Sequence, residues 1–179
     1  MLLVAPPYPI PLCVTLLAVA AAGTDIAARR IPNRLVALGL AGALVAQCLL
    51  HGVLAGALGW LAGAATGFAL LLPFYLLRGM AAGDVKLMLA IGAWVGAHMT
   101  FYIVLATFVA GGIGALAVVL MRGRMRRMWA NVRALIARHA QGKGAAATDG
   151  AAEIASVGSL PYGVAIAAGT LAMLFASYA

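Results

Sequence analysis

The sequence predicts an all-α, polytopic membrane protein with about six transmembrane helices and both termini outside. Hydrophobic residues make up 65% of the chain and charged residues only 9%. The mean hydropathy is +1.08, and so few polar residues cannot cover a soluble globule. Because a span takes roughly 20 residues, the 179 residues leave no room for a separate soluble domain. We therefore expect one membrane-embedded domain over residues 1–179.

Six apolar stretches predict the helices in order. They run over residues 9–23, 35–50, 53–77, 85–97, 100–121 and 160–178. The first has no basic residue before it and is followed by Arg29 and Arg30, so we expect a retained helix rather than a cleaved signal peptide. The fourth is short for a span. Its helix is therefore expected to begin nearer Ala81 and to include Asp84 in its first turn.

Glycines repeat every four residues in two of these stretches. Gly59, Gly63 and Gly67 share a face of the third stretch, and Gly92 and Gly96 repeat the spacing in the fourth. Such spacing lets helix backbones approach closely within a bilayer. It indicates packing rather than function.

The basic residues predict the topology. All twelve Lys and Arg residues fall into three clusters, which follow the first, third and fifth apolar stretches. Loops rich in Lys and Arg stay in the cytoplasm. Both termini and the uncharged turns at His51 and His98 are then predicted to lie outside.

The largest basic cluster has a helical pattern of its own. Within residues 122–143, apolar residues recur at the spacing of an amphipathic helix and Arg residues take the remaining surface. Residues 144–157 are rich in Gly and Ala. We expect the first segment to lie on the inner leaflet and the second to be a flexible linker. Membrane anchoring is the favoured role of the basic segment, ahead of recruiting a protein precursor or anionic lipid. Nucleic-acid binding is a distant third, because a membrane protein needs positive loops in any case.

Two of the four acidic residues border apolar stretches. Asp25 comes after the first stretch and Asp84 comes before the fourth, whereas Asp149 and Glu153 lie in the Gly/Ala-rich segment. A charge within a bilayer helix costs roughly 2.5–3.5 kcal/mol, so such carboxylates usually face a cavity or a partner. The predicted topology places both at the cytoplasmic edge, where they could meet.

Paired carboxylates carry a specific chemistry. Two close carboxylates cannot both ionise cheaply, so they share a proton. One member can then deprotonate a water while the other protonates the leaving group, as in an aspartyl peptidase. The simpler interpretation is that Asp25 and Asp84 only terminate and cap helices.

Three segments then resemble one family. Gly83-Asp84-Val85-Lys86-Leu87 resembles the second-aspartate motif of type IV prepilin peptidases, the GxGD-type membrane aspartyl proteases. Asp25 followed by Arg29-Arg30-Ile31-Pro32-Asn33 is similar to their first-aspartate segment, and Pro161-Tyr162-Gly163 resembles the start of their last helix. One position departs from the family: Ala81 stands where the first glycine of the GxGD motif is expected.

The resemblance implies a site and a reaction. The implied catalytic residues are Asp25 and Asp84. Residues implied to bind substrate or support the site are Gly83, Lys86, Pro32, Asn33, Pro161, Tyr162 and Gly163. No metal and no cofactor are implied. The implied protein substrate is a prepilin or pseudopilin precursor, cut at the cytoplasmic face of the bacterial inner membrane.

The cysteines separate this chain from the larger bifunctional members of that family. Those members carry paired CxxC zinc motifs in a methyltransferase part, whereas only Cys13 and Cys48 occur here. A structural zinc site needs about four ligands. We therefore expect no N-methyltransferase activity, and the short form resembles the peptidases of tight-adherence (Flp-type) pilus systems. Membrane lipid is the other expected partner.

Two other functions remain open at the level of the sequence. A small membrane transporter would be expected to have ionisable groups near the bilayer midplane, and none is visible in these stretches. A non-catalytic component of a pilus or secretion assembly would keep its function when both aspartates are replaced.

Overall fold

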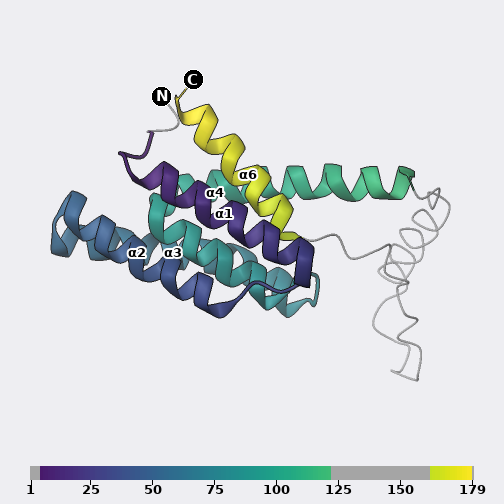
Figure 1. Cartoon of the computed structure of the whole chain (residues 1–179), viewed down its shortest axis with the longest axis horizontal. Coiled ribbons are helices and arrows are strands. Elements are labelled where there is room, and N and C mark those ends of the chain that lie inside the picture. The colour runs from purple at the N-terminus through teal and green to yellow at the C-terminus, as the bar shows by residue number, and fades with distance from the viewer. Residues whose placement is uncertain (1–4, 122–161, 179) are drawn as a thin grey trace, which may run out of the picture. The chain divides into compact units, whose positions relative to one another are not determined.

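The computed structural model describes residues 5–121 and 162–178, and within them every regular element is a helix (Figure 1). The helices are α1 (Ile10–Ala28), α2 (Asn33–His51), α3 (Val53–Leu76), α4 (Ala82–Met121) and α6 (Tyr162–Tyr178). The predicted all-α class is confirmed. α1 to α4 are long and apolar enough to cross a membrane, and α6 is a shorter apolar helix. The protein is therefore a multi-pass membrane protein, while six spans and outer termini stay predictions.

The chain divides into two compact units. One comprises residues 1–111 and 161–179, and the other comprises residues 112–160. In the second unit the described residues are the last turns of α4, which end at Met121. The predicted amphipathic segment 122–143, the predicted linker 144–157 and Pro161 lie outside the described residues.

α4 consists of two helical segments that meet at Gly96. This residue has φ 80° and ψ 169°, a conformation that is essentially restricted to glycine. The helix ladder is interrupted here, and the side-chain amide of Gln47 on α2 donates a 2.7 Å hydrogen bond to the carbonyl of Trp94. The sequence separates its fourth and fifth stretches around His98, close to this break. The fourth helix begins at Ala82 and includes Asp84 in its first turn, as predicted.

Glycines bring α3 and α4 into backbone contact. A Cβ atom added at Gly67 would lie 2.5 Å from the Met88 carbonyl oxygen, and one added at Gly63 would overlap the carbonyl of Gly92. The predicted close packing is confirmed at these positions. It is wrong for Gly59, where an added Cβ would have no neighbour within 4 Å, and for Gly96, which forms the break instead.

The first unit has its apolar core between the helices and apolar side chains on its outer surface as well. α1 packs along α6, and α2 packs along α3. Val14 of α1, Ile91 of α4 and Ile166 of α6 are fully buried. Leu38 and Leu49, in contrast, are 72% and 81% exposed, although both are large apolar residues. An apolar exterior of this kind suits lipid rather than water.

The two ends of the described chain meet. The hydroxyl of Tyr178 at the end of α6 donates a 2.7 Å hydrogen bond to the carbonyl of Pro6, just before α1. Pro6 also lines a cavity with His51 and His98, so the start, the end and these two turns share one end of the first unit. The end of α1 and the starts of α2 and α6 lie at the other end.

Candidate active site

Asp25 lies in the last turn of α1. The sequence predicts that the helix ends before Asp25, but it continues to Ala28 because Ala27 and Ala28 are strong helix formers. Arg29 then ends the helix in the left-handed conformation (φ 49°), and its N–H donates to the Asp25 carbonyl at 2.9 Å. The Asp25 side chain is only 8% exposed. Its backbone is thus fixed by the helix end that follows it.

The Asp25 carboxylate contacts the start of α6. Its Oδ2 accepts a 2.8 Å hydrogen bond from the backbone N–H of Gly163, which lies in the first turn of that helix. The first N–H groups of a helix have no acceptor within the helix, so the backbone N–H of Gly163 can donate to a side chain. This bond joins residues 138 positions apart in the sequence.

Asp84 is held by its own helix start. Its Oδ2 accepts a 3.3 Å hydrogen bond from the N–H of Ala81, and its N–H donates to the Ala81 carbonyl at 3.1 Å. The first bond is one half of a capping box, in which the side chain at the third helical position accepts the N–H of the residue before the helix. Ala81 does not have a positive φ. The alanine at this position therefore needs no glycine-like freedom.

The structure brings the two aspartates together. Asp25 and Asp84 interact electrostatically as like charges, and both are buried. Tyr162, the first residue of α6, lies close enough to Asp84 for the two side chains to interact electrostatically. In each carboxylate one oxygen is held by a backbone N–H and the other has no hydrogen-bond partner among the described residues. Such a pair can share a proton and hold a water between its members.

Two of the predicted supporting residues contact each other beside this pair. Lys86 in α4 donates a 3.2 Å hydrogen bond from Nζ to Oδ1 of Asn33, the first residue of α2, and the bond is exposed. Pro32 precedes Asn33 and starts α2, since its carbonyl accepts the N–H of Leu35 at 3.0 Å. Pro32 and Asn33 therefore position the start of α2 rather than the carboxylates.

Gly83 lies beside the segment that joins α1 to α2. A Cβ atom added there would lie 3.5 Å from Cβ of Ile31, an ordinary van der Waals distance, and Gly83 has no positive φ. Neither the space nor the backbone conformation requires glycine. At Gly163, in contrast, an added Cβ would lie 2.8 Å from Oδ2 of Asp25.

Sequence reasoning missed the partner of the Asp84 side chain. It treats Ala81 only as a departure from a motif, whereas the Ala81 N–H is the donor to that carboxylate. The three-residue spacing from Ala81 to Asp84 is the signal that identifies such a cap. Within residues 5–121 and 162–178, no three His, Cys, Asp or Glu side chains are grouped to hold a metal ion.

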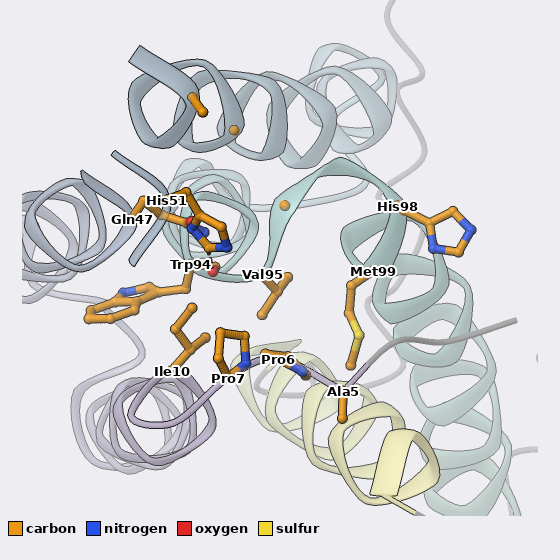
Figure 2. A pocket seen from close by; sticks show the side chains of 13 residues that line it. Ala5, Pro6, Pro7, Ile10, Gln47, His51, Trp94, Val95, His98 and Met99 are labelled. Carbon is orange, nitrogen blue, oxygen red and sulfur yellow. Dashed lines mark hydrogen bonds between the residues drawn. The ribbon is translucent and has the colours of Figure 1, made fainter. Parts of the chain in front are cut away.

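A cavity of about 520 Å³ lies at the other end of the first unit (Figure 2). Gln47 and His51 line one side of it, and His98 lies on another side. Neither aspartate is among its lining residues. This cavity is thus separate from the carboxylate pair.

The comparisons with known proteins define the class. Residues 12–116 match the model of the type IV leader peptidase family. The chain belongs to that family, whose members are membrane proteases, and the match includes both aspartates but ends before α6. No curated protein and no solved structure matches the chain.

Proposed function

We propose that this protein is a membrane aspartyl endopeptidase that cleaves the leader peptide from prepilin or pseudopilin precursors. Its active site would face the cytoplasm at the bacterial inner membrane, and the protein would have no N-methyltransferase activity. The observation that carries the proposal is the buried pair of Asp25 and Asp84, two interacting carboxylates on different helices. Membership of a leader peptidase family supports the choice of substrate class.

The mechanism uses the shared proton of the pair. One carboxylate takes a proton from a water as that water attacks the scissile carbonyl. The other carboxyl donates its proton to the departing amine nitrogen, and the pair returns to its starting state with one proton. The Oδ1 atoms of Asp25 and Asp84 are the ones available for these transfers, because Oδ2 of each accepts a backbone N–H within the part of the chain that the structure describes.

Purified protein in liposomes should cut a prepilin leader, and Asp25→Asn or Asp84→Asn should each lower turnover by roughly 10²–10⁴-fold, the usual contribution of acid–base catalysis. Both variants should melt at the wild-type temperature or higher, because a neutral amide relieves the repulsion within the pair. Cleavage on gels and thermal unfolding in detergent measure the two effects.

Asp149→Asn is the matched control, since it makes the same chemical change in the Gly/Ala-rich segment outside the described residues. It should keep wild-type turnover. Near-normal turnover in either Asp25→Asn or Asp84→Asn would remove that residue from the catalytic pair. Intact function of the assembly with both replaced would favour the non-catalytic component instead.

A further inference from the structure

We propose that the backbone N–H of Gly163 positions the Asp25 carboxylate, so that α6 orients the reacting pair without contributing a carboxylate. Gly163 is a positioning residue in this scheme, and the inference rests on the proposed function for its catalytic consequence. The contact itself is a property of the fold, and it can be measured without any substrate.

The hydrogen bond fixes one oxygen of Asp25. The N–H of Gly163 donates to Oδ2 at 2.8 Å, a distance typical of a hydrogen bond to a charged carboxylate. Within the described part of the chain, the Asp84 carboxylate interacts with that of Asp25, the Tyr162 hydroxyl interacts with Asp84, and Arg29 follows Asp25 by one helical turn. Since Oδ2 accepts the N–H, the Oδ1 atom remains for water and for the shared proton.

The absence of a side chain at position 163 makes this contact possible. An added Cβ would lie 2.8 Å from Oδ2, 3.0 Å from Cβ and 3.2 Å from Cγ of Asp25. Real Cβ atoms essentially never come within 3.0 Å of another non-bonded heavy atom, and the Asp25 backbone is fixed by the αL end of α1. A methyl group at this position must therefore displace the carboxylate or the start of α6.

The rest of α6 is held firmly, which lets its first turn act as a fixed reference. Gly169 packs against Thr107 of α4, and an added Cβ there would lie 2.6 Å from the Thr107 nitrogen. Ile166 and Thr170 are fully buried, and Tyr178 is tied to Pro6. The position of the Gly163 N–H is thus set by packing along the whole helix.

Gly163→Ala tests the catalytic consequence. We expect kcat to fall by about 10²-fold, the order of loss that a displacement near 1 Å produces, with KM within about twofold of wild type. Gly56→Ala is the control: its added methyl group also clashes, with the backbone of Gln47 at the cavity end of the first unit, away from both Asp25 and α6. It should lower the melting temperature at least as much as Gly163→Ala does while its kcat stays within a few-fold of wild type.

A second measurement keeps the contact testable apart from activity. The Gly163 amide has no acceptor within its own helix, so we expect its protection from hydrogen exchange to depend on its bond to Asp25. By NMR in nanodiscs, Asp25→Ala should speed exchange at Gly163 at least tenfold, whereas Asp84→Ala should leave it unchanged within a few-fold. If the wild-type protein cleaved no prepilin, the proposed function would be wrong. The exchange measurement would still show whether Gly163 bonds to Asp25.

Two outcomes would overturn the positioning role. One is unchanged exchange at Gly163 in the Asp25→Ala variant. The other is a Gly163→Ala enzyme whose kcat falls no further than that of Gly56→Ala once the folded fraction is matched.

Discussion

Asp25 and Asp84 are held by donors of different origin. The donor to Asp84 is the N–H of Ala81, three residues away in the same helix start, whereas the donor to Asp25 is Gly163 on another helix. Among the described residues, each buried carboxylate accepts a single N–H bond and has a like charge nearby, an arrangement that costs stability. Such unfavourable pairs persist in proteins chiefly where the chemistry needs them.

At the same scale, Lys86 should matter far less than Asp84. Its bond to Asn33 is exposed and contributes only about 0.5–1.5 kcal/mol, the usual net value of one hydrogen bond. We expect Lys86→Ala to lower kcat/KM by less than about tenfold relative to wild type, a much smaller loss than that expected for Asp84→Asn. Initial rates of prepilin cleavage measure both.

Asn33→Ala is the matched control, because it removes the other half of the same bond. If the bond explains the effect of Lys86, the double variant should be no worse than either single variant. A Lys86→Ala enzyme as inactive as Asp84→Asn would show that the ammonium takes part in the reaction.

Single residues also show how far sequence reasoning reaches. Asp25 and Asp84 are predictable because a carboxylate beside an apolar stretch is costly wherever the chain folds. The contact of Gly163 with Asp25 is not predictable in the same way, since it depends on how α6 packs against α1. A resemblance places Gly163 near the site, but only the packed helices identify the atom it contacts.

Among the elements, the helix interiors and the ends of α2 and α3 were predictable, whereas the end of α1 and the break within α4 were not. Hydropathy marks where a span runs, but the end of α1 depends on the αL conformation of Arg29 and the break in α4 depends on Gly96. Gly96 fits a packing pattern in the sequence because its spacing from Gly92 is that of a helix turn. Its φ of 80° gives it a different role, which spacing alone cannot reveal.

The interface of α3 with α4 yields a prediction at this scale. Gly63→Ala places a methyl group against the carbonyl of Gly92, and neither backbone can withdraw without shifting a helix. We expect the variant to lose about 1–3 kcal/mol of unfolding free energy, the usual cost of overpacking. Reversible unfolding in mixed micelles measures the loss.

Gly59→Ala provides the comparison, because it makes the same change four residues earlier on α3, where an added Cβ has no neighbour within 4 Å. It should match wild type or exceed it slightly, since alanine favours a helix. A Gly63→Ala protein as stable as Gly59→Ala would show that the two helices do not pack through this glycine.

At the scale of the first unit, the candidate catalytic residues lie at one end and the cavity lies at the other. Asp25, Asn33 and Asp84 lie where α1 ends and where α2 and α4 begin, close to the first basic cluster. His51 and His98 line the cavity at the other end, which holds no Lys or Arg among its lining residues. The basic clusters predict which end faces the cytoplasm, because positive loops are retained there.

This separation gives the last prediction, which concerns topology. In a background with Cys13 and Cys48 replaced by alanine, single cysteines at His51 and His98 should react with an impermeant maleimide applied to whole cells or spheroplasts. Single cysteines at Arg30 and Gly79 should react only after the membrane is opened, because they adjoin the carboxylate end and the basic clusters. Ser177→Cys, near the end of α6, should behave like the first pair, since Tyr178 is bonded to Pro6 at the cavity end. Labelling of Arg30→Cys from outside would invert the orientation, and the carboxylate pair could then not meet a leader peptide on the cytoplasmic side.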